Sequence, residues 1–168
     1  MMAKFFMGIA IVAFTSFLGY YLAKKFRQRK LFFMQLKVFN ERFLNEVSYY
    51  KRPLKEFSVQ YVYKGEFQTL LTDYFTYIES GKSKDVMGYS LLNSLDYSFL
   101  KESEKKTIEN YFSMLGKGDS ASQKSYFSTM NGELNALQSE AVATYKKYAD
   151  LYVKMGFLFG LFILILIL

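Results

Sequence analysis

The side chains that could do chemistry in this 168-residue chain are its carboxylates and lysines, because the sequence contains no cysteine and no histidine. Their absence excludes disulfides, thiolate nucleophiles and cysteine-ligated metals, and it removes the commonest general base. Fifteen aspartates and glutamates remain for carboxylate catalysis. They are scattered among lysines on what we predict to be the outer faces of helices, where solvated surface charge is the favoured interpretation. We therefore expect no catalytic residue, no cofactor and no metal.

One short stretch has part of the pattern of a phosphate-binding loop. Residues 79–85, ESGKSKD, contain Gly81-Lys82-Ser83, which matches the end of such a loop. The full motif needs a glycine five residues earlier, where this chain has Thr76, and it follows a strand, whereas a helix is predicted here. We interpret the stretch as the end of one helix and the start of another.

Two apolar segments, one at each end of the chain, flank the polar middle and should hold it at a membrane. Residues 5–23 carry no charge, and at nineteen residues they are long enough to cross a membrane as an uncleaved anchor. Residues 155–168 have no polar side chain but form only about 21 Å of helix. Starting at Leu151, with Lys154 extending to the interface, the second segment also reaches across a thin bilayer. The alternative for residues 151–168 is a buried core helix.

The basic residues predict how the chain is oriented. Residues 1–30 hold six Lys or Arg and no acid, so only +1 of the net charge of +7 belongs to the remainder. Bases near the ends of spans stay in the cytoplasm, so Arg27, Arg29 and Lys30 should fix the orientation. We predict a short N-terminal end (1–4), a span (5–23), a cytosolic helical domain (24–150) and a second span (151–168). The cluster should attract an anionic lipid bilayer and bind no nucleic acid.

The middle of the chain has the apolar spacing of helices nearly throughout. The apolar steps of three and four predict five helices before the last one. The first is marked by Phe32, Leu36, Phe39, Phe43, Val47 and Tyr50. The second begins at Pro53 with Leu54 and Phe57 and is interrupted at Gly65, and the third is marked by Phe67, Leu70, Leu71, Tyr74, Phe75 and Ile78 and is ended by Gly81. The fourth covers residues 84–95, and the fifth is marked by Ile108, Tyr111, Phe112 and Leu115.

The last helix is predicted to run from the soluble part directly into the second span. Gly116 should end the preceding helix, and Asp119 should favour the turn into the last one by its charge near the helix N-terminus. Ser120 and Gln123 have the spacing of a capping box. Apolar and small residues then recur every three or four positions as far as Met155. The alternative is a helix broken at Gly132.

Small residues in the two spans predict close helix packing. Gly156 and Gly160 form a GxxxG pair, and small residues also gather in the first span, at Ala13, Ser16, Gly19 and Ala23. Small residues let helix backbones approach in lipid, where the hydrophobic effect does not drive association. We expect the spans to pack on each other or on partners.

Four stretches carry a resemblance to a known family. They are LGYYLAKKFRQR (18–29), LKVFNERFLNEVSYYKRPLKEF (36–57), MLGKGDSASQ (114–123) and KMGFLFGLFILILIL (154–168). With this layout the whole chain resembles the stage III sporulation protein AB family of endospore-forming bacteria, which is similar to the cytoplasmic domain of type II secretion F proteins.

The resemblance implies an all-α protein, with a compact six-helix domain of the type II secretion F type between two transmembrane helices. It implies a non-enzymatic platform or coupling component of a secretion-like channel complex in the mother-cell membrane facing the forespore. The implied partners are other sporulation channel proteins, a cytosolic secretion-type ATPase and membrane channel components. Two alternatives stay open: a stand-alone membrane-anchored coiled-coil scaffold, and a membrane enzyme that uses carboxylates.

Overall fold

The computed structural model describes residues 2–46, 60–80, 97–117 and 119–167, and within these ranges the regular structure is entirely helical. Four α-helices occur there: α1 (Met2–Asn45), α3 (Glu66–Glu79), α5 (Glu102–Met114) and α6 (Ser120–Ile167). The predicted all-α class is therefore confirmed. The helices predicted from Pro53 and over 84–95 lie outside the described residues, so the six-helix count stays a prediction.

The chain divides into two compact units. Unit 1 consists of Met1–Lys30 and Glu140–Leu168, and unit 2 of Leu31–Ser139. The first part of α1 and the last part of α6 form unit 1. The remainder of both helices joins α3 and α5 in unit 2.

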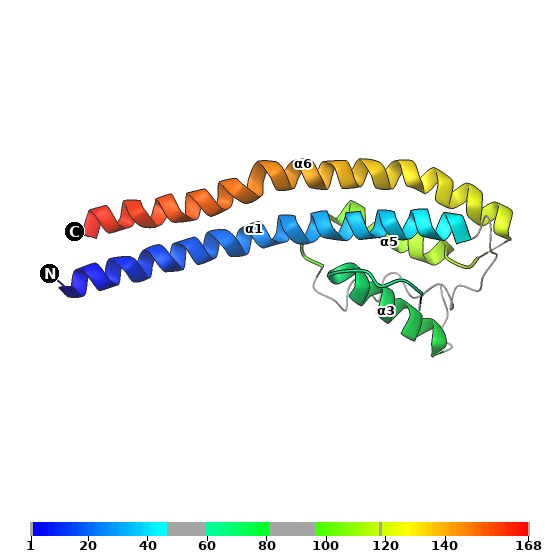
Figure 1. Ribbon diagram of the computed structural model, residues 1–168, viewed down its shortest axis with the longest axis horizontal. Helices are drawn as coiled ribbons and strands as arrows, with labels where there is room; N and C mark the ends of the chain where they lie inside the picture. The colour runs from blue at the N-terminus through cyan, green and yellow to red at the C-terminus, as the bar shows by residue number, and fades with distance from the viewer. Residues whose placement is uncertain (1, 47–59, 81–96, 118, 168) are drawn as a thin grey trace. The chain divides into compact units, whose positions relative to one another are not determined.

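In unit 1, α1 and α6 lie side by side and antiparallel, with the N- and C-terminal ends next to each other (Figure 1). Both helices are long and apolar enough to cross a membrane. Only 11% of the most apolar window of each helix is buried, so large apolar side chains face outward along both. This exposure is unlike a soluble core helix, and the alternative of a buried C-terminal core helix is therefore not favoured.

Unit 2 is built around the apolar stripe predicted for the first helix. Phe32, Leu36, Phe39 and Phe43 are all buried, which confirms that stripe as far as the structure describes it. Val47 and Tyr50, the last two predicted members, lie outside the described residues. Because residues three and four apart share one face of a helix, these side chains point together at α3, α5 and α6.

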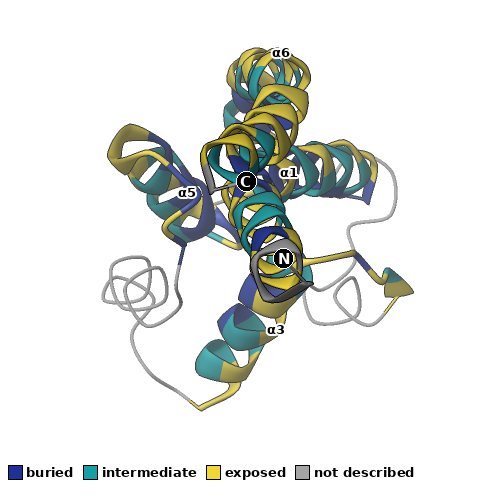
Figure 2. Ribbon diagram, turned by 90° about the vertical axis from the view of Figure 1, so that its left-hand side faces the viewer, coloured by how far each residue is buried: buried dark blue, intermediate teal, exposed yellow. Residues whose placement is uncertain are grey.

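Aromatic rings from all four helices form the core of unit 2. The Phe39 ring lies 5.7 Å from Phe67 of α3, and the Tyr111 ring of α5 lies 5.0 Å from Phe127 of α6. Phe43 of α1 also meets Phe127, at 4.8 Å and nearly edge to face. Edge-to-face pairs are favourable beyond the area they bury. Figure 2 shows the buried faces of these helices in dark blue.

Two glycines with positive φ mark the ends of helices in unit 2. Gly65, with φ of 65°, immediately precedes α3, and its carbonyl accepts a bond from the Gln68 N–H. A Cβ on Gly65 would also come within 2.9 Å of the Leu31 side chain. Gly116, with φ of 70°, follows the end of α5. Glycine adopts such angles without the steric cost that a Cβ imposes. The predicted stop at Gly81 lies outside the described residues, and α3 ends at Glu79.

The last helix is continuous. It runs for 48 residues through Gly132, which corrects the alternative of a helix broken there. Gly132 is exposed, and no side-chain neighbour approaches the position that its Cβ would occupy. A single exposed glycine weakens a helix by only about 1 kcal/mol, and its neighbours on either side hold the helix together.

Candidate functional site

The two long helices of unit 1 approach each other closely at Gly156 and Gly160, the predicted GxxxG pair. A Cβ on Gly156 of α6 would lie 2.6 Å from the Thr15 carbonyl oxygen and 3.0 Å from the Gly19 Cα. A Cβ on Gly160 would lie 2.8 Å from the Val12 Cα. Real side chains do not fit at these distances, so both positions accept glycine alone without a shift of the backbone. The GxxxG pair is thus in contact with α1.

The surface of α1 that receives these glycines includes Val12, Thr15 and Gly19. A Cβ on Gly19 would lie 2.6 Å from the Tyr152 carbonyl oxygen, so the close approach needs glycine on both helices. Thr15 is not among the small residues predicted from the sequence, although Thr15 and Gly19 are themselves a small pair four residues apart. Of the small residues predicted to share one side of the span, Gly19 and Ala23 are buried, whereas Ala13 is exposed.

The hydroxyls in the first span are satisfied within their own helix. Thr15 Oγ1 donates to the carbonyl of Ile11 or Val12, at 3.0 and 3.1 Å, and Ser16 Oγ donates to the Val12 carbonyl at 2.7 Å. A polar group without a partner is costly in hydrocarbon, and a bond back to the preceding turn removes that cost. These residues can therefore lie in an apolar helix and still present a small surface to α6.

Three basic residues near the end of unit 1 were predicted to fix orientation, and the structure separates them. Arg29 is 5% exposed, and its Nη2 lies 3.2 Å from the Glu140 Oε1 of α6. The Arg29 Nη1 also donates to the Thr144 hydroxyl at 3.5 Å. Lys30 places its Nζ 3.8 Å from the centroid of the Tyr145 ring. Arg27 is exposed. Arg29 and Lys30 thus connect α1 to α6, while Arg27 faces outward.

An aromatic stack lies between this charged layer and the glycine crossing. The Phe26 ring stacks on Tyr148 at 5.7 Å and on Tyr152 at 5.6 Å. The helix pair is therefore held by three successive kinds of contact, which are the glycine crossing, the aromatic stack and the Arg29–Glu140 ion pair. These contacts hold α1 and α6 against each other over several successive turns.

Gly116 and Asp119 lie in unit 2, at the turn from α5 to α6, and do not join the glycines of unit 1. The Lys117 N–H donates to the Met114 carbonyl at 3.2 Å across Gly116, and the Ser122 N–H donates to Asp119 Oδ1 at 3.0 Å. Bonds from Ser122 hold the pKa of the Asp119 carboxyl below its usual value.

The predicted capping box is wrong by one residue. Asp119, rather than Ser120, supplies the side-chain acceptor, and α6 begins at Ser120. Gln123 donates its Nε2 hydrogen to the Lys117 carbonyl at 3.1 Å instead of returning to a serine cap. Both residue types cap helices well, and the carboxylate also interacts favourably with the positive end of the helix.

A buried polar network in unit 2 was missed from the sequence. Asn40 of α1 is completely buried, and its Nδ2 donates to the Phe127 carbonyl of α6 at 3.2 Å. The Tyr111 hydroxyl of α5 donates to the Asn40 Oδ1 at 3.1 Å. Burial raises the pKa of Tyr111. Asn40 lies four residues after Leu36 and three before Phe43, so a polar residue within the apolar stripe was the available signal.

The acidic residues do not converge on a site in the part of the chain that the structure describes. No group of three or more potential metal ligands occurs among those residues. Glu104, which is buried, accepts a bond from the Lys101 N–H at 2.9 Å at the start of α5. This bond of the carboxylate is thus local to the helix start.

Comparisons with known proteins give one consistent result. The family described as stage III sporulation protein AB matches residues 4–168. Among curated proteins, the chain is 25% identical over 170 residues to the stage III sporulation protein AB of Bacillus subtilis (strain 168). That alignment covers 99% of each chain. No solved structure matches this chain.

Proposed function

Because this chain belongs to the stage III sporulation protein AB family, we propose that it is a membrane-anchored platform or coupling component of a secretion-like channel complex between mother cell and forespore. The two helices of unit 1 would anchor the protein in the mother-cell membrane. Unit 2 would lie in the cytosol and contact a secretion-type ATPase, while the spans contact membrane channel components. The protein would act through binding and would catalyse no reaction.

The glycine crossing of unit 1 is the observation that carries this proposal. Two apolar helices whose backbones meet at Gly19 and Gly156 form a ready-made two-span anchor. The N- and C-terminal ends lie together at one end of this pair (Figure 1). Arg29 and Lys30 contact α6 at the last residues of α1 that belong to unit 1. The positive-inside rule then places the basic end in the cytoplasm and the two chain ends on the opposite side.

The continuity of α1 and α6 supports a coupling role. α6 alone is 48 residues, or about 72 Å of helix. Each of the two helices has residues in both units, with no break in its hydrogen-bonded backbone. A force applied by a cytosolic partner to either helix would therefore reach the membrane segment of the same helix.

The likeness to the cytoplasmic domain of type II secretion F proteins is part of this proposal. It is supported by a unit whose described regular structure is helical and which lies in sequence between two apolar helical segments. The stand-alone coiled-coil scaffold is less well supported, because α1 buries its apolar stripe against α3, α5 and α6 of the same chain. A scaffold of that kind would need the stripe for a second chain.

The proposal is tested by purifying the tagged full-length protein from membranes of sporulating cells and identifying its partners by mass spectrometry. Gly156→Leu should separate the spans, reduce the recovery of channel proteins and lower the yield of spores. Gly132→Leu is the matched control, because it adds the same side chain to the same helix at an open position. Recovery of the protein without channel proteins or an ATPase, together with normal spore yield in Gly156→Leu, would overturn the proposal.

A further inference from the structure

The basic residues of unit 1 fall into two classes that the sequence does not distinguish. Arg29 and Lys30 are turned onto α6, where they contact Glu140 and Tyr145. Six others are exposed among the residues whose burial the structure describes, and we call five of them the basic collar: Lys24, Lys25 and Arg27 of α1, and Lys146 and Lys147 of α6. The sixth, Lys154, lies about two turns further along α6. We propose that the basic collar is a binding site for the phosphate headgroups of anionic lipids, formed jointly by the two helices.

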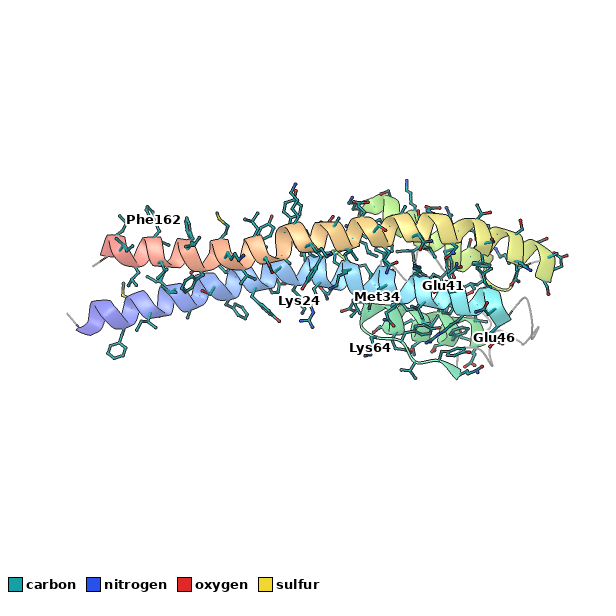
Figure 3. The ribbon with its side chains drawn as sticks, turned by 45° about the horizontal axis from the view of Figure 1, so that its top comes forward. Lys24, Met34, Glu41, Glu46, Lys64 and Phe162 are labelled. Carbon is teal, nitrogen blue, oxygen red and sulfur yellow. The ribbon has the colours of Figure 1, made fainter. Side chains whose placement is uncertain are left out.

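The contacts between the helices place the five collar residues at one level. Phe26 of α1 stacks on Tyr148 of α6, so residues 24–27 lie opposite residues 146–148. The collar therefore surrounds the helix pair instead of following one helix. Figure 3 shows Lys24 extending from the outside of the pair. Lys147 lies 5.1 Å from the ring of its neighbour Tyr148, and it remains exposed there.

The position of the collar matches the headgroup layer of a bilayer. On its apolar side come three exposed tyrosines, which are Tyr20, Tyr21 and Tyr152. Tyrosine is enriched where lipid tails meet water, because its ring is apolar and its hydroxyl is polar. Beyond the tyrosines, exposed side chains such as Phe17 and Phe162 are apolar, and Lys154 is the one exposed charge among the residues whose burial is described. Its long side chain can extend back to the interface. Lysine and arginine one turn outside such a belt reach the phosphates.

The charge at this level is strongly positive. Residues 20–27 contain no acid, and residues 146–152 contain one, Asp150. Five cations against one carboxylate leave a net charge of +4 at the collar. The other nearby carboxylate, Glu140, is engaged by Arg29. Because each exposed base near an anionic surface adds attraction, a collar of this charge should select anionic over zwitterionic lipid.

The test uses the full-length protein in phospholipid bilayers and no other protein. Electron paramagnetic resonance measures how strongly spin-labelled phosphatidylglycerol and phosphatidylcholine are immobilised at the protein surface. The native protein should prefer phosphatidylglycerol by about three-fold to ten-fold at low salt, and 1 M salt should remove most of that preference. The variant Lys24→Gln/Lys25→Gln/Arg27→Gln should bring the ratio close to unity.

The matched control removes three exposed cations from unit 2, Lys64→Gln/Lys106→Gln/Lys124→Gln, and should keep the preference. The variant Lys146→Gln/Lys147→Gln, which changes only α6, should also lower the preference for phosphatidylglycerol. It keeps the inference testable if the α1 variant does not fold. Inorganic phosphate at matched ionic strength should compete no better than chloride; stronger competition would mean that the collar takes free phosphate instead. An equal ratio for both lipids in the native protein, or equal loss in the control, would overturn the inference.

This inference rests on the membrane insertion included in the proposed function, and the two can fail separately. If the protein does not enter the bilayer, the proposed function fails. If the protein enters the bilayer and immobilises both lipids equally, only the inference that the basic collar binds anionic lipid fails.

Discussion

Gly19 and Gly156 face each other across the two long helices so closely that a Cβ on Gly156 would lie 3.0 Å from the Gly19 Cα. The same Cβ would lie 2.6 Å from the Thr15 carbonyl oxygen. Neither neighbour is the flexible end of a side chain, because both are backbone atoms. The helices must therefore separate before any larger residue fits at this position.

Gly156→Leu should accordingly destabilise the helix pair by about 1–3 kcal/mol, the range found when well-packed contacts are overfilled. The measurement is denaturation of the full-length protein by sodium dodecyl sulfate in mixed micelles, followed by circular dichroism. Gly160→Leu should behave similarly, because its Cβ would meet Val12. Unchanged stability in both variants would show that the helices do not cross at these glycines.

Gly132→Ala should stabilise the protein by up to about 1 kcal/mol. Gly132 lies inside α6, and no atom approaches the position of the new methyl group. Alanine then adds helix propensity and reduces the entropy of the unfolded chain without creating a clash. Thermal denaturation monitored by circular dichroism checks the sign. A loss of stability would reveal a neighbour at this face.

Arg29 and Glu140 should show a measurable coupling in a double-mutant cycle. The Arg29 side chain is 6% exposed, whereas that of Glu140 is 49% exposed, so the pair is intermediate between a surface and a buried ion pair. We expect Arg29→Gln and Glu140→Gln to interact by about 1 kcal/mol. The corresponding cycle for Lys37 and Glu41, an i,i+4 pair on α1, should give about half that value. Equal coupling energies would mean that burial of Arg29 adds nothing.

The Tyr111 hydroxyl should contribute more to the free energy of unfolding than the Tyr126 hydroxyl. Tyr111→Phe removes the donor to Asn40 Oδ1 in a fully buried setting, and the amide oxygen is left without that partner. An unsatisfied buried acceptor costs about 1–3 kcal/mol. Tyr126→Phe, at a half-buried position on α6, is the control and should change the free energy of unfolding by less than about 0.5 kcal/mol. Urea denaturation gives both values, and similar losses would contradict the network.

The parts of this fold that the sequence predicts are those with local signals. The stripe from Phe32 to Phe43 follows from the helical repeat, and the continuity of α6 follows from the absence of proline after Ser120. The features that could not be predicted from the sequence, such as the buried Asn40 network, depend on which helices pack against each other. Asn40 becomes interpretable only when Tyr111 and Phe127 are known to surround it. A single sequence does not contain that pairing.

The basic residues that follow the first apolar segment are a second example of features that depend on which helices meet. Arg27, Arg29 and Lys30 look equivalent in sequence, and the positive-inside rule treats them alike. Rotation by about 100° per residue places Arg29 towards α6 and Arg27 away from it, so only a knowledge of the helix-packing face separates them. The cap of α6 was misplaced for a related reason, because Asp119 and Ser120 are both good caps and the backbone decides between them.

The start of α6 should depend on pH through Asp119. Hydrogen bonds from Ser122 lower the pKa of this carboxyl in the folded protein below its usual value of 3.8. A group whose pKa is lowered by folding contributes stability that is fully present above its unfolded pKa and is lost as the pH falls through the folded value. The first turn of α6 should therefore loosen below about pH 4, and Asp119→Asn, which keeps a cap but cannot ionise, should lack this change. Amide hydrogen exchange at Ser122, measured from pH 2 to pH 6 and corrected for the intrinsic exchange rate, compares the two proteins. Identical pH profiles would show that the charge of Asp119 does not hold this turn.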